Sequence, residues 1–180
     1  MDDRLLPHDI TTGRLLLRVP LPEDALELFN SYAQDPEVVR YLTWKPSKAL
    51  VDSKRHIADR ILAWQRGNIC AWSIIHSECD RFIGMIELRI KGKVANVGYV
   101  LARAMWGNGY ATEALNAVIC AGLALPQIDK ITGLCDVENI ASIQVMKKAG
   151  MVQEGVLHRY IVHPNISREP RNVYTFAVTK

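Results

Sequence analysis

The chain has 180 residues, of which 49% are hydrophobic and 23% are charged, and its formal net charge is +3. These values are ordinary for a globular protein, and the length suits one domain, which we expect to span residues 1–180. The charge is weak and forms no basic stripe with interleaved aromatic residues, so a nucleic-acid partner is not expected. No stretch approaches the length of a membrane span, and the N-terminal segment lacks the apolar run of a signal peptide.

Four cysteines are present, at positions 70, 79, 120 and 135. None forms a C-x-x-C pair, and no histidine stands at the spacing of a zinc ligand, so we expect no metal site. The pattern instead favours free thiols in a reducing compartment, which predicts a cytoplasmic location.

The first third of the chain predicts one strand followed by helices. Residues 13–19 form an apolar strand-like run, and residues 22–34 predict a helix with Pro22 in its first turn. A short helix follows Pro36, and residues 47–67 predict a longer one that Gly67 closes.

The rest of the chain predicts a meander and then alternating elements. Short connections join expected strands at 70–76, 82–90 and 94–102, so these strands should be antiparallel neighbours. A helix from about residue 111, a strand, a second helix and two closing strands then follow, the last four at 130–137, 139–150, 151–162 and 172–178. The order predicts an α/β (α+β) fold with a mixed, mostly antiparallel sheet flanked by helices.

A glycine-rich loop precedes the helix that begins near residue 110, in the stretch WGNGYATEA at 106–114. The first N–H groups of a helix lack internal partners, and the helix dipole favours negative charge there, so a phosphate fits this position. The alternative is a tight strand-to-helix turn without a ligand. The Walker sequence is absent, and the dinucleotide fingerprint fails because Thr112 stands where its third glycine would be.

Two blocks of sequence resemble the GNAT acetyltransferase superfamily, in particular its RimJ/RimL branch. The run VGYVLARAMWGNGYATEAL is similar to the superfamily's coenzyme-binding motif, and DVENIASIQVMKKAGM at 136–151 is similar to the block that follows it in this branch. The segments at 35–46 and 169–176 also resemble the branch, so the likeness covers nearly the whole chain. It implies a GNAT fold and acetyl-CoA as the cosubstrate.

The resemblance also implies where acetyl-CoA binds. Its pyrophosphate would bind main-chain N–H groups of the loop, and its pantetheine arm would lie where the strand before the loop separates from the next strand. Leu101 would contact the arm from one side and Asn139 from the other. The expected loop residues are Trp106, Gly107, Asn108, Gly109, Tyr110, Ala111 and Thr112.

Two residues are candidates for the chemistry, which by resemblance is direct attack of an amine on the thioester. Ser142 lies one turn after Asn139 and is the candidate for protonating the departing thiolate, because Met146 stands where many members have tyrosine. Its alternative role is that of an ordinary helix serine. Glu87 is the candidate base, and the alternative is a solvated strand face on which it pairs with Arg89. Position 96, often glutamate in this branch, is asparagine.

Three aromatic residues are candidates for binding the acceptor: Tyr41, Trp44 and Tyr160. The leading hypothesis is transfer of an acetyl group to a primary amine, in particular a protein N-terminal α-amine, by a monomer or homodimer. One alternative is a small-molecule amine as the acceptor. Another is a catalytically silent acyl-CoA-binding module that serves regulation.

Overall fold

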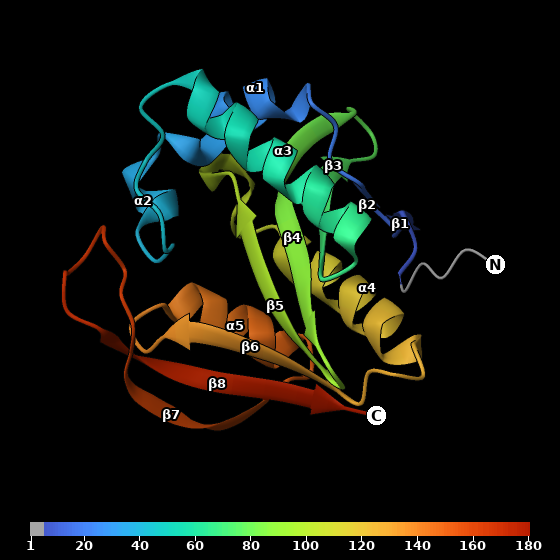
Figure 1. Cartoon of the computed structure of the whole chain (residues 1–180), viewed down its shortest axis with the longest axis vertical. Coiled ribbons are helices and arrows are strands. Elements are labelled where there is room, and N and C mark those ends of the chain that lie inside the picture. Colours follow the sequence, from blue (N-terminus) through green and yellow to red (C-terminus); the bar gives the residue numbers. More distant parts are fainter. Residues whose placement is uncertain (1–5) are drawn as a thin grey trace.

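A computed structural model describes residues 6–180 as one eight-stranded sheet with helices on both faces (Figure 1). The first five residues, part of the segment for which we expected no signal peptide, lie outside this description. The strand order is β1-β2-β3-β4-β5-β6-β8-β7. In chain order the elements are β1 (Asp9–Thr11), β2 (Leu15–Arg18), α1 (Asp24–Leu28), η1 (Phe29–Ala33), α2 (Pro36–Val39), α3 (Leu50–Arg66), β3 (Ile69–His76), β4 (Arg81–Lys91), β5 (Val94–Leu101), η2 (Arg103–Met105), α4 (Tyr110–Ala124), β6 (Lys130–Asp136), α5 (Ile140–Lys148), β7 (Val152–Ile161) and β8 (Arg171–Thr179).

The expected fold class and most expected elements are confirmed. The meander β3–β4–β5 is antiparallel, as the short connections required. Gly67 ends α3 with φ of 72°, a left-handed conformation that suits glycine. The helix expected at 22–34 is divided instead, because α1 ends at Leu28 and the chain continues as the π-helical turn η1. The short strand β1 was not anticipated.

The two faces of the sheet carry different helices. α4 and α5 pack over the larger hydrophobic cluster, which includes Leu115, Val118 and Ile143. α1 and α3 cover the opposite face, where Leu28 and Ile57 belong to a second buried cluster. Figure 1 shows α1, α2 and α3 gathered on one side of the strands. Any ligand that reaches the sheet from one face therefore meets different side chains from a ligand on the other.

The strands β5 and β6 form the parallel pair of the sheet, and they separate halfway along. Their pairing runs from Val94–Lys130 to Val97–Gly133 and stops there. Beyond that point β5 stays paired with β4 as far as Leu101, and β6 stays paired with β8 as far as Asp136. Figure 1 shows the two strands diverging in a V. The expected separation of the strand before the loop from the next strand is thus present. Residues 98–101 of β5 and 134–136 of β6 therefore do not pair with each other.

Within residues 6–180, no helix is long and apolar enough to cross a membrane. The same part of the chain brings together no group of three or more His, Cys, Asp or Glu side chains that could hold a metal ion.

Candidate active site

The glycine loop leads directly into α4. Gly107 and Gly109 have φ of 78° and 80°, and Gly109 is the residue just before the helix. The first helical bond runs from the Glu113 N–H to the Gly109 carbonyl at 3.0 Å. The N–H groups of Tyr110, Ala111 and Thr112 therefore precede the first helical bond, as expected of an anion-binding helix terminus.

Carbonyl groups of this loop accept hydrogen bonds from two side chains, Asn108 and Arg14. The side-chain amide of Asn108 donates to the carbonyls of Met105 at 3.3 Å and Trp106 at 3.0 Å. Arg14 donates through Nη1 to the Asn108 carbonyl at 3.0 Å. A trans peptide points its C=O and N–H in opposite directions, so the N–H of Gly109 points away from Arg14. The loop residues fit a pyrophosphate, because the carbonyls of Met105, Trp106 and Asn108 have side-chain partners and the Gly109 N–H points away from Arg14.

Arg14 contacts this loop from the first hairpin, and nothing in the sequence indicated that contact. It lies between β1 and β2, and its Nε donates to Glu113 Oε2 at 2.8 Å, 99 residues away. Its guanidinium group also lies over the Tyr110 ring, 4.5 Å from the centroid. Burial raises the pKa of Glu113, but hydrogen bonds from Thr12 and Arg14 lower it by more. The pKa therefore lies below its ordinary value, and the carboxylate stays charged. Arg14 thus ties the first hairpin to the loop and pairs with the carboxylate in the first turn of α4.

Replacing Arg14 with glutamine should raise the KM for acetyl-CoA several-fold and change kcat less. The reason is the loss of the contact that orients the Asn108 peptide, together with the loss of the cation that pairs with Glu113 at the start of α4. Steady-state kinetics with varied acetyl-CoA measures both constants. Arg66→Gln, at the far end of α3, is the control. An unchanged KM in a folded Arg14→Gln protein would contradict this role.

Trp106 contacts the edge of β5 instead of facing only solvent. Its Nε1 donates to the Leu101 carbonyl at 2.9 Å, although the side chain is 46% exposed. The bond from the Ala102 N–H to the Ile83 carbonyl fixes the pairing with β4, which directs the peptide groups of Leu101 toward the gap. Leu101 therefore lies where the resemblance expects a contact with the pantetheine arm. That contact stays a prediction. The Leu101 carbonyl that would face the arm already accepts a hydrogen bond from Trp106.

Asn139 and Ser142 stand at the start of α5, on the other side of the gap. Asn139 caps the helix, because its Oδ1 accepts the Ser142 N–H at 3.2 Å. Ser142 Oγ lies 2.8 Å from the hydroxyl of Tyr99 on β5. Sequence analysis identified Ser142 but not Tyr99, because nothing local indicates that a strand tyrosine faces a helix 43 residues later.

Glu87 is not a free carboxylate. It accepts from Arg60 of α3 at 2.8 Å and also pairs with Arg89 on its own strand. The pairing with Arg89 was the alternative in the sequence analysis, and Arg60 is an addition. Asn96, where the branch often has glutamate, donates to Thr132 of β6 at 3.1 Å. The candidate base Glu87 is thus an acid paired with two arginines, and position 96 holds an amide that bonds to the next strand.

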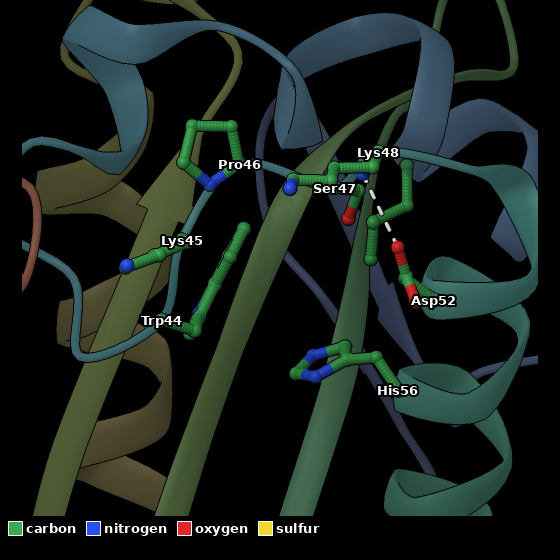
Figure 2. Close-up of a pocket in the computed structure, with 8 residues that line it drawn as sticks. Trp44, Lys45, Pro46, Ser47, Lys48, Asp52 and His56 are labelled. Carbon is green, nitrogen blue, oxygen red and sulfur yellow. Dashed lines mark hydrogen bonds between the residues drawn. The ribbon is translucent and has the colours of Figure 1, made fainter.

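A cavity of about 320 Å³ lies between α1, the chain before α3, and α3 itself (Figure 2). It is lined by Leu28, Trp44, Lys45, Pro46, Ser47, Lys48, Asp52 and His56. Trp44 and Leu28 also pack with the cluster that contains Met85 and Ala102 at the sheet, so the cavity lies next to β4 and the end of β5. It is on the α3 face, opposite the glycine loop and α4.

His56 is a polar residue of this cavity whose place the sequence did not indicate. Its ring lies 6.2 Å from the Trp44 ring, tilted by 41°, and Figure 2 shows it pointing from α3 toward the indole. Burial lowers its pKa, and the charge of Arg60 lowers it further. The imidazole is therefore neutral at pH 7.

The other two expected acceptor residues do not line the cavity. The Tyr41 hydroxyl donates to the Glu138 carbonyl at 3.3 Å, so it joins the front of the chain to the segment before α5. Tyr160 is 58% exposed on β7, the outermost strand on that side of the sheet. Of the three aromatic candidates, only Trp44 lines the cavity.

The loop between β7 and β8 holds the segment that carries Trp44. Asn165 donates through Nδ2 to the carbonyls of Val39 and Trp44, both at 2.7 Å. Figure 1 shows this loop reaching from the C-terminal strands toward α2. At its base the buried Asp136 accepts from Arg171 at 2.6 Å. The segment that carries Trp44 is thus held in place by a loop that is more than 100 residues away in the sequence.

Comparison with known proteins places this geometry in a family. The acetyltransferase (GNAT) domain family matches residues 14–152. An uncharacterized N-acetyltransferase of Bacillus subtilis, YnaD, is 32% identical over 162 residues, which are 87% of this chain and 89% of YnaD. The chain therefore belongs to the GNAT acetyltransferase family, and its activity is that of an acetyl-CoA-dependent N-acetyltransferase.

Solved structures show the same fold. The microcin C7 self-immunity acetyltransferase MccE, in complex with acetyl-CoA and AMP, has a TM-score of 0.86 at 22% identity and covers 99% of this chain and 100% of its own. A Salmonella typhimurium acetyltransferase that modifies the N-terminal serine of ribosomal protein L7/L12 has a TM-score of 0.85 at 20% identity, with coverage of 96% and 99%. RimJ/RimL-type enzymes are thus among the structural neighbours.

Proposed function

We propose that the protein transfers the acetyl group of acetyl-CoA to the α-amine at the N-terminus of a peptide or protein. The observation that carries this proposal is the state of the candidate bases. Glu87 is paired with two arginines, and Asn96 cannot accept a proton. An α-amine has a pKa of about 7.7–8.0, so its neutral form is available near pH 7 without a strong base. The Salmonella enzyme named above, which acts on an N-terminal serine, supports this acceptor class.

The two substrates approach from opposite faces of the sheet. The glycine loop belongs to the α4 face and the Trp44 cavity to the α3 face, and both lie beside the end of β5. An amine held over Trp44 would meet the thioester in the gap between β5 and β6. The amine nitrogen then bonds to the carbonyl carbon, the carbon–sulfur bond breaks, and the electron pair leaves on sulfur. The amine loses one proton and the thiolate gains one.

A small acceptor is the second candidate, and the form of the cavity favours it. Trp44 offers an aromatic surface, and Lys45 and Lys48 lie at the same wall. A volume of about 320 Å³ accommodates a small molecule or a few residues of a peptide. An acidic or aromatic amine would suit these groups better than a polyamine, because like charges repel.

A panel of acceptors tests the proposal. Purified protein with acetyl-CoA is given peptides with a free N-terminus, the same peptides with the N-terminus blocked, and small amines, and thiol release is followed. We expect release with the free peptides and an acetyl group on their N-terminus by mass spectrometry. Release with small amines alone would replace the first acceptor class with the second. In either case Trp44→Ala should raise the KM of the acceptor and leave that of acetyl-CoA unchanged.

A further inference from the structure

The hydroxyl group of Tyr99 lies at the point where the gap between β5 and β6 opens. Tyr99 is two residues beyond Val97, the last residue of β5 that pairs with β6. Its oxygen lies 2.8 Å from Ser142 Oγ and 3.3 Å from the Ser142 carbonyl oxygen. The contact therefore crosses from β5 to the first turn of α5, beside the expected course of the thioester arm.

We infer that Tyr99 is a positioning residue that directs the hydroxyl hydrogen of Ser142 toward the sulfur that leaves acetyl-CoA. Each hydroxyl has a single hydrogen. When the phenol donates to Ser142 Oγ, the hydrogen of Ser142 is free for another acceptor. When the phenol donates to the Ser142 carbonyl instead, Ser142 Oγ donates to the phenol, and its hydrogen is no longer available to the sulfur. Negative charge developing on sulfur favours the first arrangement, and Tyr99 supplies the donor that it requires.

The neighbourhood of Ser142 already contains a sulfur atom. Burial raises the pKa of the Cys135 thiol to about 11, the charge of Asp136 adds to the rise, and a hydrogen bond with Ser142 opposes it. The Ser142 hydroxyl is thus placed to stabilise a thiolate on the β6 side of the gap. Cys135 itself remains a protonated thiol at pH 7. The thiolate that the Ser142 hydroxyl would stabilise in the reaction is therefore that of the departing coenzyme.

Tyr99 acts as a hydrogen-bond donor and keeps its own proton. Burial raises its pKa above the ordinary value, and the bond with Ser142 opposes that rise without cancelling it. An ordinary thiol has a pKa of about 8.5 and an ordinary phenol about 10, so full proton transfer from phenol to thiolate is uphill. The proton that the thiolate finally takes is the one that the amine loses. The inference rests on the proposed role of Ser142 and is independent of which amine is the acceptor.

A double-mutant cycle tests the inference. Tyr99→Phe keeps the ring and removes the hydroxyl, and it should lower kcat by about tenfold, the effect of one lost hydrogen bond, with little change in the KM for acetyl-CoA. Ser142→Ala should lower kcat at least as much. The double variant should be no slower than Ser142→Ala alone, because Tyr99 acts through Ser142. Tyr174→Phe, which removes a phenol hydroxyl from β8 on the far side of β6, is the control and should keep kcat.

Three kinetic results would overturn the inference. They are wild-type kcat in a folded Tyr99→Phe protein, wild-type kcat in Ser142→Ala, and losses that multiply in the double variant. Thermal unfolding of each variant establishes that it is folded.

A binding measurement tests the same geometry without any acceptor. Free coenzyme A becomes a thiolate as pH rises through about 8.5, whereas S-methyl coenzyme A cannot. For the wild type, the affinity for coenzyme A relative to its S-methyl form should increase between pH 7 and pH 9. Tyr99→Phe and Ser142→Ala should each lose this increase, and an increase of wild-type size in either variant would refute the placement. A protein that shows the increase yet acetylates no amine would instead refute the proposed function.

Discussion

Gly109→Val is expected to weaken acetyl-CoA binding by more than tenfold. Gly109 has φ of 80°, a region that a β-branched residue enters only with strain of about 1–3 kcal/mol. A side chain there would also meet Arg14, because an added Cβ lies 3.6 Å from its Nη2. The valine methyl groups would therefore displace the contact that orients the Asn108 peptide. Both effects act on the loop form that presents N–H groups to the pyrophosphate, and about 1.4 kcal/mol corresponds to tenfold in affinity.

Gly67→Val is the matched control for this experiment. Gly67 has a similar φ of 72° at the end of α3, but an added Cβ there meets no atom within 4 Å. The backbone strain is comparable and the glycine loop is untouched. Calorimetric titration with coenzyme A should show a loss only in Gly109→Val. Equal losses in the two folded variants would mean that global strain, and not the loop, controls affinity.

α-Amines are expected to be better acceptors than lysine side chains by a few hundredfold in kcat/KM at pH 7. Deprotonation at that pH costs about 1 kcal/mol for an α-amine and about 4.6 kcal/mol for a lysine of pKa 10.4. The difference of about 3.5 kcal/mol remains unless the site supplies a base. Glu87 is held by Arg60 and Arg89, and His56 beside the cavity is a weak base because burial lowers its pKa. These groups give the site limited power to remove a proton from a lysine.

The pH dependence provides the test. One peptide has only its N-terminus free, and a second has only a lysine side chain free, in otherwise identical sequence. For the α-amine, kcat/KM should level off above about pH 8, whereas for the lysine it should continue to rise by about tenfold per pH unit toward pH 10. If the lysine peptide is the better substrate at pH 7, the site contains an effective base, and the N-terminal acceptor must be abandoned.

The sequence predicted the parts of the site that depend on local pattern. Gly107 and Gly109 stand beside the helix that they serve, so their positions in the chain were enough to predict an anion site. The pairing of Glu87 with Arg89 was also visible, because residues two apart on a strand share a face.

The contacts that complete the site join distant segments, and no local pattern indicates them. Arg14 reaches the loop from the first hairpin, and Tyr99 reaches Ser142 from another strand. His56 appears in the sequence as one polar residue of an amphipathic helix, and only the packing of α3 on the sheet turns it toward Trp44. Tyr41 and Tyr160 do not line the cavity beside Trp44, and their expected role in binding the acceptor stays a prediction.

The contact between Arg14 and Glu113 has a consequence for the order of folding. It closes a segment of 99 residues, so the chain must bring its first hairpin onto α4 before the loop is complete. Contacts this far apart form late, because the entropy of closing a long segment is lost before they compensate for it. Helix α4 can form from its own residues, but the loop contacts of Arg14 cannot. If the loop binds the coenzyme as proposed, a fragment that retains the glycine motif without the first hairpin lacks the residue that orients the Asn108 peptide.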